Sequence, residues 1–115
     1  MAIKRIESGP RLSRAVVANG MVYLSGLTAD DTSADVKGQT EQILAKIDKY
    51  LKEAGSDKSK IVSANIWLSD IRTFNQMNKA WDAWVSPGNA PARATVESEL
   101  ANPQLQVEIM CQAVL

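Results

Sequence analysis

Two charged residues stand among small and apolar residues in the C-terminal part of the chain. Arg93 lies in Pro91-Ala92-Arg93-Ala94-Thr95-Val96-Glu97, and Glu108 lies in Gln106-Val107-Glu108-Ile109. Both segments alternate with the period of a β-strand. An arginine binds a carboxylate through parallel N–H donors, and a glutamate orients a water molecule or takes a proton from it. The two residues are therefore candidates for a site that binds a carboxylate and activates water.

The alternation also predicts which side chains share a face. In the first segment Arg93, Thr95 and Glu97 share one face. In the second, Glu108 lies opposite an apolar face, which consists of Leu105, Val107, Ile109, Cys111 and Ala113. If the two strands pair, Arg93 and Glu108 project to the same side of the sheet, away from the core.

Each of these residues also has a structural interpretation. Arg93 could form an ion pair that locks the sheet, and Glu108 could be a solvated residue on an open face. Glu97 has only its position in the alternation to recommend it. Cys111 lies on the predicted apolar face, where cysteine behaves as a small hydrophobic residue, so we interpret it as part of the core and not as a nucleophile.

Length and charge limit the class of protein. A chain of 115 residues is long enough for one domain, which we expect to span residues 1–115. Thirteen basic and thirteen acidic residues give no net charge, so nucleic acid is not an expected partner. A single cysteine excludes an intramolecular disulfide, and the sequence shows neither a signal peptide nor a membrane span. We therefore expect a cytoplasmic protein.

The absence of histidine restricts the possible chemistry. It excludes Ser-His and Cys-His nucleophilic sites and histidine-ligated zinc. The glycine-rich motifs that bind mononucleotides and dinucleotides are also missing. We therefore expect no histidine-ligated metal and no nucleotide cofactor, and any catalysis must use carboxylates, arginine, lysine, hydroxyls, the thiol or backbone groups.

Turn residues and apolar periodicity predict the elements that hold these residues. Asn19-Gly20 is a strong signal for a two-residue hairpin turn between strands 15–18 and 21–24. A strand over 3–7 comes first. An amphipathic helix from Val36 ends before Gly55, and a second one follows Thr73. The strand between them, 61–69, places Val62, Ala64, Ile66 and Leu68 on one face. With the two C-terminal strands the order is β-β-β-α-β-α-β-β.

Two helices cover only one face of such a sheet. The predicted fold is therefore α+β, with a mixed sheet of five to six strands and both helices on one face. Trp67, Met110 and Val114 fall on the uncovered face by their position in the alternation. An apolar face of this kind indicates a subunit interface.

Several of these segments together resemble the Rid family, the YjgF-like reactive intermediate deaminases. The segments are Asn19 to Gly26, Trp67 to Asp70, Met77-Asn78, Pro91 to Glu97 and Val107 to Ile109. The resemblance covers almost the whole chain and implies a chorismate-mutase-like fold in a homotrimer with clefts between subunits. It also implies hydrolysis of reactive 2-imino and enamine acids to 2-keto acids and ammonia without a cofactor.

The resemblance assigns roles to particular positions. Arg93 matches the arginine that binds the substrate carboxylate, and Glu108 matches the glutamate that orients the attacking water. Ser25, Gly26 and Asn78 fall where the family lines the cleft.

The chain departs from the family pattern at two positions. Thr95 stands where many deaminases of this family have a cysteine. Backbone groups near Thr95 and Ser25 are expected to hold the rest of the substrate. The tyrosine that usually follows Gly-Pro is absent, since Arg11 follows Pro10. Two other functions stay open. One is a trimer that binds small carboxylates as a sensor or scavenger without turnover, and the other is an endoribonuclease or translation inhibitor.

Overall fold

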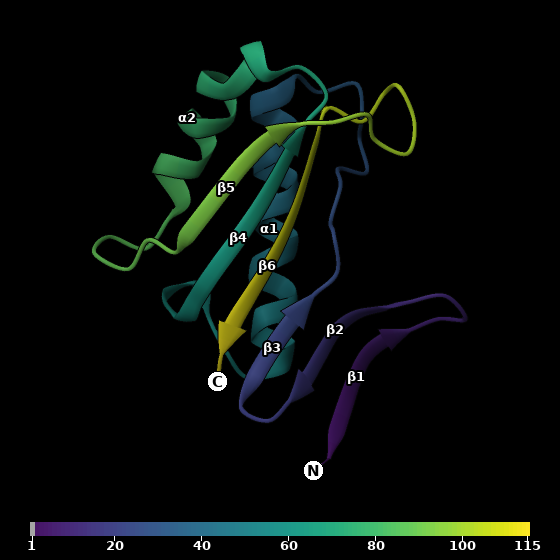
Figure 1. Cartoon of the computed structure of the whole chain (residues 1–115), viewed down its shortest axis with the longest axis vertical. Coiled ribbons are helices and arrows are strands. Elements are labelled where there is room, and N and C mark those ends of the chain that lie inside the picture. Colours follow the sequence, from purple (N-terminus) through teal and green to yellow (C-terminus); the bar gives the residue numbers. More distant parts are fainter. Residues whose placement is uncertain (1) are drawn as a thin grey trace.

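Six strands form one mixed sheet, and two helices cover one of its faces (Figure 1). The computed structural model describes residues 2–115. The strands are β1 (Ile3–Ser8), β2 (Ser13–Ala18), β3 (Met21–Leu24), β4 (Ile61–Leu68), β5 (Ala92–Glu97) and β6 (Val107–Val114). The helices are α1 (Val36–Ala54) and α2 (Phe74–Trp84), with short 3₁₀ turns at Lys58–Lys60 and Ile71–Thr73. This order confirms the prediction from the sequence.

The turn and cap residues act as their types predict. Asn19 and Gly20 have φ of 51° and 78°, the left-handed values that a two-residue hairpin turn requires between β2 and β3. Asp35 caps α1 by accepting a hydrogen bond from the Gly38 N–H at 2.8 Å. Gly55 ends α1 with φ of 90°. The predicted hairpin and first helix are confirmed.

The strand order in the sheet is β1-β2-β3-β6-β4-β5, so β6 is internal and β5 is an edge strand. The predicted apolar face of β6 is buried against the helices. In β4 the pairing shifts by one residue between Ile61 and Ser63. Ile61 therefore joins Ala64, Ile66 and Leu68 in the core, whereas Val62 is exposed. The prediction that Val62 shares their face was wrong, because a bulge interrupts the alternation.

The register of β4 determines where the two charged candidates project. β5 runs parallel to β4 with Arg93 opposite Ala64, and β6 runs antiparallel to β4 with Glu108 opposite Trp67. Residues that are paired across strands point to the same face. Ala64 is buried on the helix-covered face, and Trp67 lies three residues further along, on the other face. Arg93 and Glu108 therefore project from opposite faces.

This arrangement contradicts the expectation that Arg93 and Glu108 share a side away from the core. β5 and β6 are not neighbours, because β4 lies between them. In addition, the apolar side of β5 is the uncovered side, where Val96 is 49% exposed. Apolar residues at an edge strand therefore did not mark the core, and the charged side of β5 faces α2 instead.

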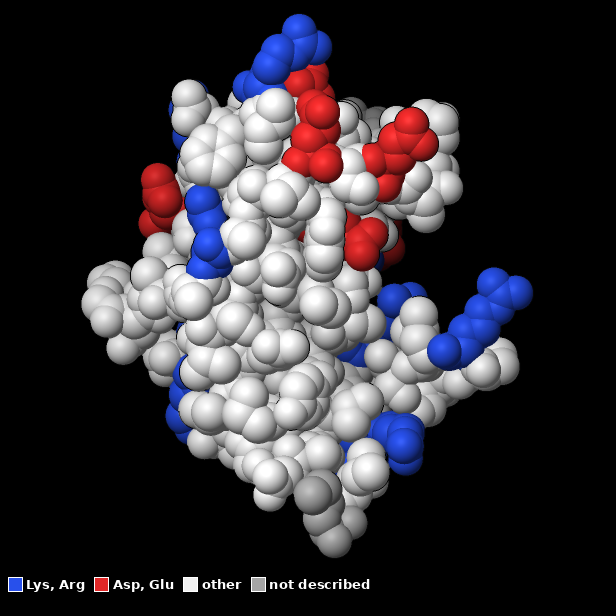
Figure 2. All heavy atoms as spheres, in the orientation of Figure 1, with Lys and Arg blue, Asp and Glu red and all other residues white. Residues whose placement is uncertain are grey.

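The sheet face opposite the helices carries apolar residues over much of its area. Tyr23, Val96 and Val114 are exposed, and Trp67 and Met110 are half-buried. In the orientation of Figure 1, α1 lies behind the sheet, so Figure 2 looks onto the uncovered face. Charged side chains gather mainly around its margin in that view, and the centre is largely uncharged. Across residues 2–115, neither helix is long and apolar enough to cross a membrane.

Candidate functional site

The side chain of Arg93 extends from the edge strand β5 toward helix α2. Its Nη1 donates to Oδ1 of Asn78 at 2.8 Å and lies 4.0 Å from Sδ of Met77. The guanidinium carbon lies 5.1 Å from the ring centre of Trp81 and 5.7 Å from that of Phe74. The amide and the two rings fix the direction of the guanidinium group. The structure thus brings together two of the predicted site residues, Arg93 and Asn78.

The charge of Arg93 is not matched by a carboxylate. No Asp or Glu among residues 2–115 forms an ion pair with it. Burial lowers the pKa of Arg93 from its ordinary value, an effect that the more distant Asp82 opposes. An arginine nevertheless stays protonated in proteins. The site therefore holds a partly desolvated cation with free N–H donors, which favours an anionic ligand.

Two buried hydroxyl groups lack a hydrogen-bond partner in the described chain, and both belong to predicted site residues. They are Oγ of Ser25 and Oγ1 of Thr95. Thr95 lies two residues beyond Arg93 on β5 and therefore on the same face. A buried hydroxyl without a partner is costly, so contacts within the described chain do not account for the burial of these two groups.

Glu108 and Gly26 form a second cluster on the uncovered face. A methyl group on Gly26 would collide with the Glu108 carboxylate. Next to Gly26, Leu27 exchanges two backbone hydrogen bonds with Ile109, at 2.9 and 3.1 Å. The absence of a side chain at Gly26 thus gives the carboxylate its position. Ser25 precedes Gly26 in the chain, and its N–H donates to the Arg14 carbonyl at 2.9 Å.

The predicted site residues therefore fall into two separate groups within one chain. Arg93, Asn78 and Thr95 lie on the helix-covered side at the β5 edge, and Glu108 lies with Gly26 on the uncovered side. From the register, Arg93 and Glu108 are separated by about 10 Å along the strands and about 10 Å across them. One chain therefore does not present both groups to the same small molecule.

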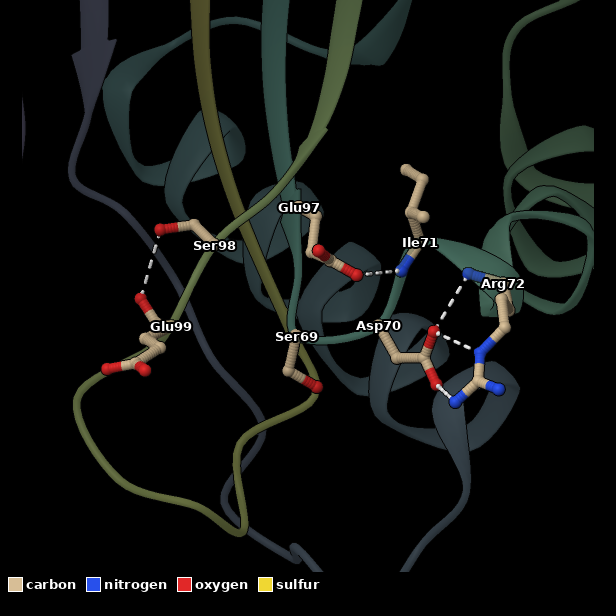
Figure 3. Close-up of a pocket in the computed structure, with 7 residues that line it drawn as sticks. All are labelled: Ser69, Asp70, Ile71, Arg72, Glu97, Ser98 and Glu99. Carbon is tan, nitrogen blue, oxygen red and sulfur yellow. Dashed lines mark hydrogen bonds and ion pairs between the residues drawn. The ribbon is translucent and has the colours of Figure 1, made fainter.

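Glu97 belongs to a different place in the fold. Its carboxylate accepts a hydrogen bond from the Ile71 N–H at 3.0 Å, at the edge of an open hollow where β4 and β5 end (Figure 3). In the same hollow Arg72 binds Asp70 through Nε and Nη2, at 3.0 and 2.9 Å. These contacts give Glu97 a structural role, in agreement with its interpretation from the sequence.

The sequence alone did not reveal the aromatic residues around Arg93. Phe74, Asn78 and Trp81 stand at intervals of four and three residues on α2, so they share one side of that helix. Trp81 is buried, as expected for the apolar side of an amphipathic helix. The spacing of Phe74 and Trp81 relative to Asn78 was the signal in the sequence that could have placed these rings beside the site. In the described part of the chain, no group of three or more acidic or cysteine side chains is placed to hold a metal ion.

The fold and these residues define a small α+β protein with a partly buried arginine at the edge of its sheet. Residues 2–115 match the family model described as Endoribonuclease L-PSP. A RutC family protein from Escherichia coli is 46% identical over 95% of each chain. A crystal structure of a YjgF family member from Neisseria meningitidis superposes with a TM-score of 0.96 at 45% identity, covering 99% of this chain and 95% of that one.

The chain therefore belongs to the endoribonuclease L-PSP family, which contains the YjgF and Rid proteins. Its fold is the chorismate-mutase-like fold of that family, as the sequence predicted. A further relative is named Reactive Intermediate Deaminase A, a chloroplast protein of Arabidopsis thaliana. The two sequences are 34% identical over a segment that spans 90% of this chain and 58% of that protein.

The interpretation of Cys111 as a core residue is confirmed, since its side chain is 1% exposed. Burial raises the pKa of its thiol to about 12. At pH 8 the reactive thiolate is therefore about a thousandfold scarcer than for a thiol of pKa 9. We predict that a chromogenic disulfide reagent labels the native protein at least a hundredfold more slowly than the denatured protein. Equal rates would contradict this assignment.

Proposed function

We propose that this protein hydrolyses reactive 2-imino and enamine acids to 2-keto acids and ammonia. The observation that carries the proposal is the Arg93 guanidinium, which is partly desolvated, held by Asn78 and two rings, and free of any carboxylate partner in the described chain. Membership of a family that includes a relative named as a reactive intermediate deaminase supports the same chemistry. The substrates would be small molecules that carry a carboxylate.

In the proposed mechanism Arg93 binds the substrate carboxylate. One Nη1 hydrogen bond holds the guanidinium against Asn78, and the remaining N–H donors face the ligand. Backbone groups near Ser25 and Thr95 supply further polar contacts to the substrate. Binding thus fixes the position of the electrophilic carbon before reaction.

Glu108 activates the attacking water. The water oxygen bonds to the iminium carbon, and its proton passes to Glu108 and then to the departing nitrogen. The carbon–nitrogen bond then breaks as the carbonyl forms, and the remaining hydroxyl proton passes to Glu108 and on to the released ammonia. One protonated imino acid and one water thus give one keto acid and one ammonium ion. Because a protonated imine is already electrophilic, positioning and one general base suffice. The mechanism therefore requires neither histidine nor a cofactor.

Both residues reach one substrate only if the active site is shared between chains. Arg93 lies at the free edge of β5, and Glu108 lies on the uncovered, largely apolar face. We propose that the uncovered face of one subunit packs beside the β5 edge of the next, so that each cleft combines Arg93 of one subunit with Glu108 of another. Repeated around a threefold axis, this contact closes a homotrimer with three sites.

The family model is described as an endoribonuclease. RNA is therefore the alternative substrate that an experiment must exclude. With thirteen basic and thirteen acidic residues, the chain has no excess of positive charge to bind a polyanion. A test of the proposal therefore includes an RNA arm. Coupled to an amino acid oxidase that generates imines, the protein should accelerate ammonia release, and RNA should stay intact. RNA cleavage without ammonia release would overturn the proposal.

Substitutions of the two charged residues should have different kinetic effects. Arg93→Ala removes contacts made both before and during reaction, which costs about 2–5 kcal/mol, or roughly 30- to several-thousand-fold in kcat/KM. Arg93→Lys should restore little, since a lysine does not bind a carboxylate through two parallel donors. Glu108→Gln should lower kcat by about 10²- to 10⁴-fold and leave keto-acid affinity within about tenfold. Steady-state kinetics and calorimetric titration with a 2-keto acid provide these values.

Glu97→Gln serves as the matched control, because Glu97 bonds the Ile71 N–H and lies outside both groups. It should retain wild-type kinetics. A fully active Glu108→Gln protein, with Arg93→Ala affecting only thermal stability, would contradict the proposed roles. A wild-type protein that binds the keto acid but releases no ammonia would identify a carboxylate sensor or scavenger instead.

The uncovered sheet face makes a prediction about assembly. Light scattering at micromolar concentration should report a trimer. A Trp67→Lys substitution places a charge in the centre of the apolar face and should shift the protein toward monomer. Glu53→Lys, on the exposed side of α1, is the control and should leave the trimer intact. A monomeric wild type would refute the shared site.

A further inference from the structure

Gln39 is the one fully buried amide side chain in the described part of the chain, with 0% of its surface exposed. It lies in the first turn of α1, and its backbone N–H donates to the Asp35 carbonyl at 2.8 Å. A buried amide is costly unless each of its polar atoms finds a partner. Here both ends of the side chain are satisfied, and their partners belong to two different loops.

The Nε2 group of Gln39 donates to the loop before α1 and to the loop before β6. Its acceptors are the carbonyl of Thr32 at 3.3 Å, that of Ala34 at 3.2 Å and that of Gln104 at 3.2 Å. Its Oε1 accepts from the Gln106 N–H at 3.0 Å. Three carbonyls around one atom and an N–H at the other establish the orientation of the amide.

The hydrogen bonds of Gln39 reach both chain segments that meet where Gly26 contacts Glu108. Gln106 stands two residues before Glu108, and its carbonyl accepts from the Ser69 N–H at 3.1 Å. The other loop leads back from Thr32 to Leu27, which bridges Ile109. Glu108 is thus held between Gln106 and Ile109, and one glutamine joins the segments that carry Glu108 and Gly26.

We propose that Gln39 is a positioning residue that sets the place of the Glu108 carboxylate against Gly26. The inference rests on the proposed function of Glu108, because a water-orienting base must keep its place within a fraction of an ångström. Arg93 lies on the opposite face of the sheet, at the far edge, and receives no bond from this network. Loss of Gln39 should therefore reduce catalysis more than carboxylate binding.

Gln39→Met tests the proposal, because methionine fills a similar volume but forms none of the four hydrogen bonds. We expect kcat to fall about 10- to 100-fold while KM and keto-acid affinity change less than about threefold. Thr40→Val is the matched control: Thr40 is also fully buried, but its hydroxyl donates only to the Val36 carbonyl within α1, at 2.7 Å. It should lose stability and keep its kcat.

Amide hydrogen exchange supplies a readout that is independent of activity. In the wild type the Gln106 amide should exchange at least a hundredfold more slowly than a free loop amide, although it lies outside the strand. Gln39→Met should abolish that protection and shift the NMR signals of Glu108 and Gly26, and Thr40→Val should do neither. An unprotected Gln106 in the wild type overturns the proposal even if the variant does not fold.

The kinetic and exchange results separate the two proposals. If the wild type releases no ammonia, the deaminase function fails, and the exchange pattern alone decides whether Gln39 holds Glu108. If the wild type is active, an unchanged kcat in a folded Gln39→Met protein overturns the positioning role. An equal loss of kcat in Thr40→Val would also overturn it, because the effect would then follow stability and not position.

Discussion

The pairing of β4 with its two neighbours is the constraint on which the site depends. β4 binds β5 in parallel and β6 in antiparallel register, and these registers place Arg93 beside Ala64 and Glu108 beside Trp67. Since neighbouring residues of a strand point to opposite faces, a shift of one residue in either register would bring Arg93 and Glu108 to the same face. The separation of the cation from the carboxylate is therefore built into the sheet itself.

That separation has an energetic consequence for each residue. If Arg93 and Glu108 met within one chain, they would neutralise each other, and the guanidinium would not be free to bind a substrate. Instead, Asn78 and the rings of Phe74 and Trp81 hold a cation without supplying a counter-charge. On the other face, Gly26 leaves room for the Glu108 carboxylate. Each half thus holds one of the two residues without the other, as the proposed site between subunits requires.

Local signals in the sequence predicted the elements well. Asn19-Gly20 specified its turn through positive φ, and Gly55 marked the end of α1 for the same reason. The order of elements and the core role of Cys111 also followed from patterns within single segments, and the placement of both helices on one face followed from the number of helices and strands.

The errors arose where the answer depends on two segments at once. Arg93 and Glu108 were assigned to one face because strand order is not encoded in either strand, and an edge strand such as β5 carries apolar residues on its uncovered side. Val62 was misplaced by a bulge in the pairing with β6. Gln39 gave no signal at all, since a glutamine on a helix is usually a surface residue and its partners here lie up to 67 positions away.

Mixed assembly tests the shared site most directly. Arg93→Ala and Glu108→Gln subunits, each strongly impaired alone, are unfolded together, refolded in equal amounts and assayed for ammonia release. If each cleft takes Arg93 from one subunit and Glu108 from the next, about a quarter of the clefts in random trimers contain both intact residues, and about a quarter of wild-type activity returns. If both residues of a cleft came from the same chain, no cleft would be intact. Activity that stays at the level of the separate variants would contradict the shared site.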